Sequence, residues 1–443
     1  MHDQSANLLD LRALGLRPDR REALVQKLRT VFPEKANEPL LGPLADSLIY
    51  RKAFDRSRLQ RGAAEDCFLD NLASIQTLTS GHPRRLLLNR SLIGASERYD
   101  FLSTRIDGEW GLLETLNFLA LGSIVPTKRV AVLTSARNEG INLLEWIGHY
   151  RALGADSIFV YTNDNEDGSD ALLRLLADHK VITLVENDTR LETNVQVKMF
   201  HHAVWFLPEL YDHEWFLFVD IDEFFVPSGG LRTLGDVVQS LETLPHAVSG
   251  ACFNWKWFGS DSEFARTPGL HFERFRSSAK NPHVKTFSRL RDVTGFKTAH
   301  LPRLVSGGTL VDGNFAPLRN VINDVSPAYT YGQINHYWNK SFEEFLVKRH
   351  RGGGMSNELR DYAHFFEWAW GNMDKGDADP FPNWLAEAVR SEIGVLRGLP
   401  YVARAAGEVE TEFAALLARI TAGTNPRELY LEALLRVKGT VTR

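Results

Sequence analysis

The sequence predicts an α/β protein built on a mostly parallel sheet, with an N-terminal domain before it and a helical region after it. Between residues 128 and 350, apolar segments rich in β-forming residues alternate with segments of helical periodicity. This alternation indicates βαβ units, whose strands run parallel. Polar residues also gather directly after each expected strand, at the edge where open α/β sheets bind their ligands. The same pattern therefore predicts a binding site.

The elements of the α/β part follow one another along the chain. Residues 129–136 (RVAVLTSA) are apolar and rich in β-formers, which predicts a buried strand. Apolar residues at helical spacing between 141 and 150 predict a helix that Gly154 ends. The elements expected after it are strands at 157–163, 181–187 and 214–222 and helices at 170–178 and 195–207.

Two changes in the character of the sequence divide the chain into three parts. Pro126 precedes the first strand, so residues 1–127 are expected to form an N-terminal domain whose role the sequence does not indicate. Residues 128–350 make up the α/β domain. Residues 351–443 carry apolar positions three and four apart, interrupted by a polar loop, and are expected to be helical.

The composition is that of a folded, soluble protein. Of the 443 residues, 44% are hydrophobic and 24% charged, as in ordinary globular chains. The 51 basic and 56 acidic residues leave a net charge of −5, which argues against a nucleic-acid-binding protein. The two cysteines, Cys67 and Cys252, are too few for a disulfide framework and favour a reducing compartment.

No segment resembles a signal peptide or a membrane span. Residues 1–10 are polar where a signal peptide would be basic and then apolar. The longest apolar run, 112–125, is interrupted by Glu114 and Asn117 and is too short to cross a bilayer. We expect a cytoplasmic protein, with peripheral contact as the one form of membrane association left open.

An acidic pair marks the end of the fourth expected strand. Asp220 and Asp222 follow an almost wholly apolar segment. Carboxylates at the tip of a buried strand repel one another and lose hydration unless a cation lies among them. Oxygen ligands suit Mg²⁺ or Mn²⁺, whose coordination substrate phosphates often complete. We therefore predict that Asp220 and Asp222 bind one of these ions; the alternative is a pair of solvated acids.

Several motifs in series resemble one known group of enzymes. They are residues 135–173 (SARNEG to SDALL), 196–204 (QVKMFHHAV), 214–225 (EWFLFVDIDEFF), 253–260 (FNWKWFGS), 283–290 (HVKTFSRL) and 334–352 (INHYWNKSFEEFLVKRHRG). Together they resemble glycosyltransferases of the GT-A type, in particular the family 92 and family 2-like group. The resemblance implies a Rossmann-like GT-A core, a nucleotide-sugar donor and an acceptor sugar.

The resemblance also assigns roles around the donor. The residues that it places at the nucleotide are Thr134, Arg137, Asn138 and Glu139 after the first strand and Asn163, Asp164 and Asp167 after the second. Turn and capping chemistry explains the second group equally well. On the helix before the acidic strand, Gln196, Lys198 and His201 are candidates to face the donor; for Lys198, a surface position is the alternative.

Residues late in the α/β part are expected to complete the site. Enzymes of this type often supply a histidine to the metal well after the acidic pair, and we expect His336 rather than His300; the alternative is a core histidine. The basic residues expected to close over the diphosphate as a mobile segment are Lys340, Lys348, Arg349 and Arg351. Basic residues at a helix end also suit the helix dipole without any ligand.

The acceptor side is indicated by aromatic and acidic residues. Trp255, Trp257 and Phe258 offer faces for stacking on a sugar, although alternating aromatics also suit a core strand. An attacking hydroxyl needs a carboxylate base. We predict Asp261, which follows the aromatic stretch; a turn role is its alternative, and Glu263 and Asp312 are the other candidate bases.

The sequence therefore predicts an inverting, metal-dependent glycosyltransferase. Its donor is expected to be a UDP-sugar, with galactose the first choice, and its acceptor a glycan, polysaccharide or lipid-linked sugar. The resemblance supplies inversion and galactose. Two other classes stay open. A nucleotidyltransferase would carry a glycine-rich basic loop, which SARNEG is not; an inactive glycan-binding protein would not need Asp220 and Asp222.

Overall fold

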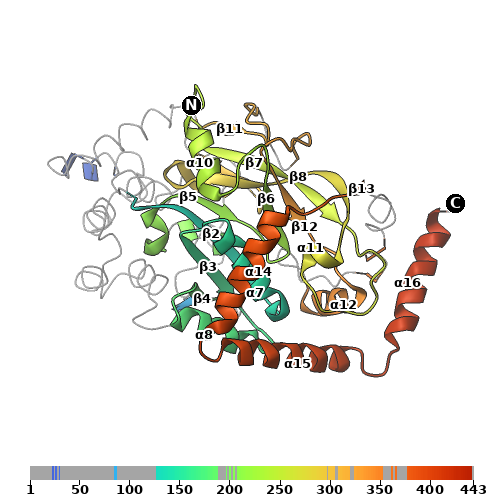
Figure 1. The fold of residues 1–443 in the computed structure, drawn as a ribbon. Helices are drawn as coiled ribbons and strands as arrows, with labels where there is room; N and C mark the ends of the chain where they lie inside the picture. Colours follow the sequence, from blue (N-terminus) through green and yellow to red (C-terminus); the bar gives the residue numbers. More distant parts are fainter. Residues whose placement is uncertain are drawn as a thin grey trace.

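The computed structural model describes residues 126–187, 207–296, 298–304, 308–319, 324–352 and 377–441, with parts of 22–29, 84–86, 196–204 and 361–366. Its centre is one large sheet covered by helices (Figure 1). The sheet order is β1-β4-β3-β2-β5-β8-β7-β12-β6. The expected α/β class is confirmed.

The first half of the sheet is parallel. The strands in it are β1 (Arg84–Leu86), β2 (Lys128–Ala136), β3 (Ser157–Thr162), β4 (Thr183–Asn187) and β5 (His213–Phe218). β1 pairs with β4, so three residues of the 1–127 segment extend the same sheet. The connecting helices are α7 (Gly140–Ala152) and α8 (Ser169–Asp178). These elements match the expected ones closely, because each has a clear local period.

The second half of the sheet is mixed. β8 (Ser277–Arg289) runs antiparallel to β5 and to β7 (Gly250–Phe258), and β12 (Gly332–His336) joins β7 to β6 (Glu223–Pro227). The expected strand 214–222 is shorter than predicted: it ends at Phe218, and a turn leads directly into β6. The remaining elements of this half are α10 (Leu234–Glu242), α11 (His271–Arg274), α12 (Phe342–Arg351), β9 (Val293–Phe296), β10 (Pro302–Leu304), β11 (Leu310–Val311), β13 (Asp377–Ala378) and the 3-10 turns Pro208–Asp212 and Leu290–Asp292.

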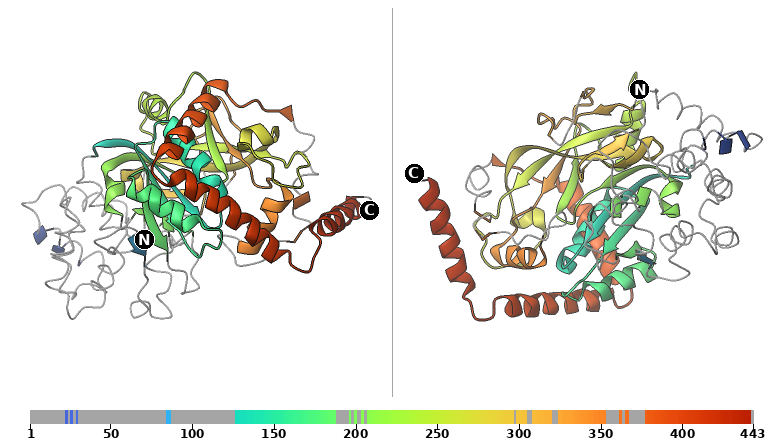
Figure 2. Two further views of the ribbon diagram at one scale, coloured as in Figure 1. Left: turned by 60° about the horizontal axis from the view of Figure 1, so that its bottom comes forward. Right: turned by 180° about the vertical axis from the view of Figure 1, so that it is seen from behind.

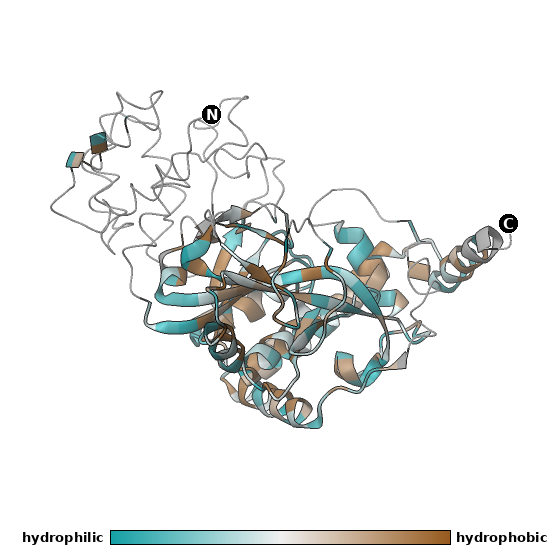
Figure 3. Ribbon diagram, turned by 90° about the horizontal axis from the view of Figure 1, so that it is seen from above, coloured by the Kyte–Doolittle hydropathy of each residue, from teal (hydrophilic) through white to brown (hydrophobic). Residues whose placement is uncertain are grey.

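The C-terminal region is helical, as expected. It consists of α14 (Asn383–Gly398), α15 (Val402–Ile420) and α16 (Pro426–Val441). α14 packs on α7 and α15 passes the ends of α7 and α8, while α16 extends away from the sheet (Figures 1 and 2). α14 and α15 carry both brown and teal in Figure 3, as helices with one buried and one exposed face should.

The core explains why α7 is apolar on most of its surface. α7 lies between the sheet and α14, and Leu143, Ile147 and Tyr150 are fully buried. At its first residue, Gly140, a Cβ would lie 2.6 Å from Val409 of α15, so only glycine permits this close approach. Gly154 adopts φ +78° just after the helix and ends it as predicted. No helix among the described residues is long and apolar enough to span a membrane.

One buried histidine on α7 links stability to pH. His149 is 1% exposed, its Nε2 lies 2.8 Å from the carbonyl oxygen of Phe225, and its ring packs edge-on against Phe224. Burial disfavours the charged ring and lowers its pKa from 6.5 to about 4. The unfolded chain therefore takes up a proton that the folded chain refuses between these two pH values.

We expect this histidine to contribute to acid denaturation. Its contribution to stability is complete above pH 6.5 and is lost as the pH falls toward 4, by about 2 kcal/mol at pH 4.5. Urea unfolding of His149→Gln between pH 7 and 4.5 should therefore show a shallower loss than the parent chain. The half-buried His179 offers a control, His179→Gln; equal slopes for all three proteins would contradict the assignment.

Candidate active site

Strand pairing brings the predicted site residues to one edge of the sheet. β2 and β5 are parallel neighbours, so Glu139, after β2, and Asp222, after β5, follow adjacent carboxyl ends. β12 pairs with β6 in a register that sets His336 opposite Glu223. His336 thereby comes next to Asp222 although the two are far apart in sequence. The site is thus assembled by the order of the strands.

Asp222 lies at the centre of this edge. Its side chain is 5% exposed; Oδ2 accepts a hydrogen bond from Lys348 Nζ at 2.5 Å, and Oδ1 faces His336 Nε2 at 3.6 Å. Lys348 also donates to the Trp338 carbonyl at 2.9 Å and lies over that ring. Burial works against the charged carboxylate, but Lys348 and His336 outweigh it, so the pKa of Asp222 is well below its usual range.

Asp220 points to different partners. Its Oδ1 accepts from Gln196 Nε2 at 2.8 Å and its Oδ2 from Lys285 Nζ at 3.0 Å. Lys285, on β8, is 1% exposed and also lies 3.4 Å from Glu223 Oε2. Burial raises the pKa of Glu223 to about 8, although Lys285 lowers it. Sequence reasoning missed Lys285; its signal was a lone cation within the apolar segment of β8.

A second group of charges lies beside the first. Glu139, 4% exposed, accepts from Lys340 Nζ at 2.9 Å and from Arg351 at 2.6 Å. Burial raises the pKa of Glu139, but Arg351 and Lys340 reverse this and hold it below its usual value. Asp222 and Lys348 also act on this pKa, so the two groups share one electrostatic site. Of the basic segment predicted to close over a diphosphate, Lys340, Lys348 and Arg351 thus already lie at the sheet edge.

Other predicted nucleotide residues have varied surroundings. Arg137 donates to the carbonyl oxygens of Asp164 and Arg351, at 3.3 and 3.0 Å. Asn163 donates to the carboxylate of Asp164 at 3.3 Å, and Asp164 is exposed. Thr134 is buried within β2. Arg137, Asn163 and Asp164 therefore form the accessible rim.

Two further residues of this group brace loops. Asn138 accepts from the Glu166 amide at 2.6 Å. Asp167, fully buried, accepts from the Gly140 amide at 2.8 Å and the Ser169 hydroxyl at 2.6 Å. Asp167 thus has the capping contacts that its alternative reading requires. Lys198 and His201 lie outside the described residues.

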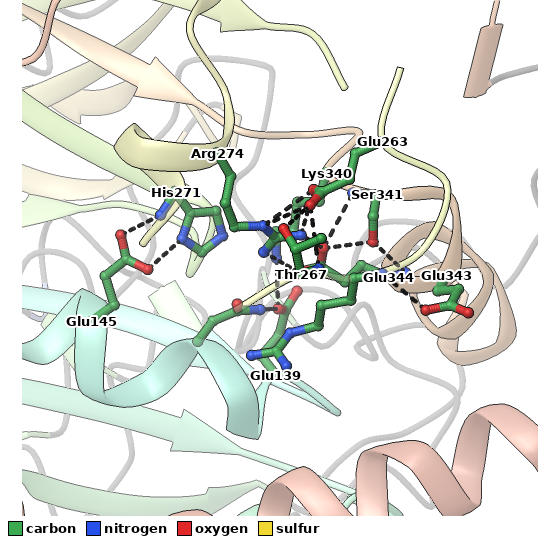
Figure 4. A network of polar contacts seen from close by, with 12 residues as sticks. Glu139, Glu145, Glu263, Thr267, His271, Arg274, Lys340, Ser341, Glu343 and Glu344 are labelled. Atoms are coloured by element: carbon green, nitrogen blue, oxygen red, sulfur yellow. Dashed lines mark hydrogen bonds and ion pairs between the residues drawn. The ribbon is translucent and has the colours of Figure 1, made fainter. Parts of the chain in front are cut away.

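The start of α12 is held by a buried ion network (Figure 4). Arg274 donates to Glu263 at 2.7 Å and to Glu344 at 2.5 Å. Glu344 also accepts from the Ser341 hydroxyl at 2.7 Å, in a capping box. Burial would raise the pKa of Glu344, but Arg274 lowers it to about 2. This network positions Lys340 and Lys348 at the sheet edge, whereas Arg349 stacks on Tyr362.

The tryptophans of β7 adjoin the site. The ring centroids of Trp255 and Trp257 lie 4.2 and 5.2 Å from that of His336, because alternate strand residues share a face. Phe258 points to the other face and packs on Tyr337 in the core. His300 lies edge-on to Trp255 and accepts or donates at the Val284 carbonyl, 2.9 Å away.

The three candidate bases all have structural partners. Asp261, at φ +45° in a turn, accepts from the amides of Arg276 and Ser277 at 2.5 and 3.4 Å. Glu263 belongs to the Arg274 network. Asp312 accepts from two amides of its own turn. The role of Asp261 as base stays a prediction.

The residues fit a divalent metal with few protein ligands. Within the described part of the chain, no three His, Cys, Asp or Glu side chains converge. Asp222 Oδ1 and His336 Nε2 face each other without a hydrogen bond, and the buried Nδ1 of His336 has no hydrogen-bond partner among the described residues. Mg²⁺ and Mn²⁺ are often held by one or two side chains and completed by phosphates. Asp222 and His336 suit this mode, whereas Asp220 is engaged by Gln196 and Lys285.

An α/β sheet with acidic residues and buried cations at its carboxyl edge has the architecture of enzymes that transfer groups from nucleotide diphosphates. Residues 136–351 match the model of Glycosyltransferase family 92. This segment is a glycosyltransferase family 92 domain, and the resemblance noted from the sequence is confirmed.

The comparisons with individual proteins are more partial. A glycosyltransferase family 92 protein of Ricinus communis is 31% identical over 111 residues, which are 25% of this chain and 19% of that protein. The chain thus matches about a fifth of the relative's length. A structure of S. aureus TarS 1–349 has 12% identity and a TM-score of 0.27, over 67% of this chain and 92% of that one. The same fragment in complex with UDP has 11% identity and a TM-score of 0.25, with the same coverage.

Proposed function

We propose that this protein is an inverting, metal-dependent glycosyltransferase that uses a UDP-sugar, with galactose the first sugar to test. The acceptor is a glycan, polysaccharide or lipid-linked sugar. The observation that carries the proposal is the pair formed by Asp222 and His336 beside the buried cations Lys340, Lys348 and Arg351. Inversion and galactose rest on the family resemblance alone.

The buried cations suit the bond that breaks. When the glycosidic bond to the donor opens, negative charge develops on the leaving diphosphate. Lys340, Lys348 and Arg351 come from one segment whose start the Arg274 network fixes, so they are in place before the charge develops. A Mg²⁺ or Mn²⁺ ion held by Asp222 and His336 would supply further charge neutralisation.

The acceptor and the compartment follow from neighbouring features. Trp255 and Trp257, next to His336, are the proposed platform for the acceptor sugar. We place the reaction in the cytoplasm, since the chain has only two cysteines and Cys252 is a free, buried thiol. Peripheral contact with a membrane would bring the protein to a lipid-linked acceptor.

The direct test is a donor screen with the full chain. Nucleotide sugars are added with Mn²⁺, stabilisation is measured by thermal shift, and released nucleotide is then detected with and without candidate acceptors. UDP-galactose is expected to stabilise the protein and to release UDP. If no nucleotide sugar binds and none is hydrolysed, the enzymatic proposal is wrong and a glycan-binding role replaces it.

The proposed metal ligand His336 gives a sharper prediction. His336→Ala is expected to weaken Mn²⁺-dependent UDP binding at least about tenfold, because it removes one of two protein ligands. Isothermal titration of UDP at saturating Mn²⁺ measures this effect. His179→Ala, on the surface beside Pro400, is the matched control and should bind like the parent chain. Equal losses in the two variants would show that His336 is only a core residue.

Asp261 is the proposed general base. Asp261→Asn should lower turnover by about 10²-fold while leaving UDP affinity unchanged, as expected for loss of a base that does not touch the donor. Steady-state kinetics and UDP titration together separate these effects. Near-normal turnover would transfer the role to Glu263 or Asp312, which the corresponding amide variants then test.

A further inference from the structure

The charges around the proposed donor site do not balance. We call Glu139, Asp222, Lys340, Lys348 and Arg351 the donor-site ion cluster. Its three cations face two carboxylates, and every member is buried or nearly so. Asp220 adds no free negative charge beside it, since Lys285 is 3.0 Å from its carboxylate. The cluster therefore carries one surplus positive charge.

The position of Lys348 matters most for a metal ion. Its ammonium occupies Oδ2 of Asp222, the carboxylate whose other oxygen faces His336. A divalent cation held by Asp222 and His336 would thus lie close to a fixed ammonium that shares the same carboxylate. Like charges at such separations repel strongly away from bulk water. Lys348 is also anchored by the Trp338 carbonyl at 2.9 Å, so its displacement would cost a hydrogen bond.

A diphosphate reverses this balance. A nucleotide diphosphate brings at least two negative charges to a site with surplus positive charge, and Lys340, Lys348 and Arg351 would all attract it. Once those charges are present, a divalent ion is attracted rather than repelled. The affinities for metal and diphosphate are then coupled through charge alone, and such coupling acts equally in both directions.

We infer that this site takes up a divalent metal only together with a diphosphate, and that Lys348 is the residue that keeps the free metal out. The inference rests on the proposed function, because it assumes that Asp222 and His336 hold the metal. It goes further in assigning Lys348 a role in the order of binding. Metal and nucleotide enter as a complex, or the nucleotide enters first.

The experiment measures Mn²⁺ binding without turnover. Free Mn²⁺ is followed by its electron paramagnetic resonance signal while the full chain is titrated, with and without UDP. The parent chain should bind Mn²⁺ about tenfold more tightly or better when UDP is present, and Mn²⁺ should strengthen UDP binding by the same factor. Lys348→Met should bind Mn²⁺ alone at least about tenfold more tightly than the parent chain does.

Two further variants keep the test decisive. Lys256→Met removes a lysine that pairs with Asp379 on the same sheet, outside the donor-site ion cluster, and should leave Mn²⁺ binding unchanged. Lys340→Met removes a charge from the cluster without touching Asp222; it should shift Mn²⁺ affinity as Lys348→Met does, by less, and serves if Lys348→Met does not fold.

The outcomes separate the inference from the proposed function. Equal Mn²⁺ affinity with and without UDP in the parent chain would overturn the inference while leaving a metal site in place. Weaker Mn²⁺ binding by Lys348→Met would also overturn it, because Lys348 would then orient Asp222 for the metal. If the parent chain binds neither UDP nor Mn²⁺ with UDP, the proposed function itself fails.

Discussion

Replacing Asp222 by Asn should lower sugar transfer by at least about 10³-fold, the order of magnitude for losing one preorganised electrostatic contact at a reacting centre. The substitution removes the charge that faces His336 and pairs with Lys348. Because Asn keeps the size of Asp, and Lys348 keeps the carbonyl and ring of Trp338, the fold should survive.

Transfer is measured as nucleotide release with saturating donor and Mn²⁺, and the fold by circular dichroism and thermal unfolding. Asp178→Asn, at the exposed end of α8, is the matched control and should retain the parent rate. Parent-like activity of Asp222→Asn at saturating Mn²⁺ would remove Asp222 from the proposed site. Loss of the folded state would instead make its charge a structural requirement.

Replacing Arg274 by Met should destabilise the chain by about 3–5 kcal/mol, the cost of leaving buried charges without their partner. Arg274 is 5% exposed and pairs with both Glu263 and Glu344. Its loss leaves Glu344 buried without its main counter-charge. Since Glu344 caps α12, which carries Lys348, donor binding should weaken as well.

The pH dependence distinguishes this effect from lost packing. In the parent chain, the lowered pKa of Glu344, about 2, means that its contribution to stability is present above about pH 4.5 and lost as the pH falls toward 2. The deficit of Arg274→Met should therefore shrink on acidification. Urea unfolding at pH 7 and pH 4 measures it, with Arg390→Met as control, since Arg390 is 51% exposed and its pair with Glu273 is worth at most about 1 kcal/mol. A deficit that does not change with pH would mean that packing dominates.

The sequence by itself determined the parallel half of the fold. β2 to β5, α7 and α8 each have a local period or a turn signal, and the C-terminal helices have three- and four-residue spacing. It also placed Asp220 and Asp222 at a strand end, because an apolar run followed by carboxylates is a local pattern. The motif series identified the family for the same reason, since it is a property of short segments in order.

Only the tertiary structure decided which charges meet. His336 faces Asp222 because of the register between β12 and β6, and Lys285 reaches Asp220 from β8. Even the end of β5 was decided this way: residues 219–222, apolar enough to continue a strand, turn instead into β6, which pairs with β12. Sequence periodicity shows which residues are buried, but an ion pair depends on strand order, register and the cost of burying an unpartnered charge, and these are properties of the assembled fold.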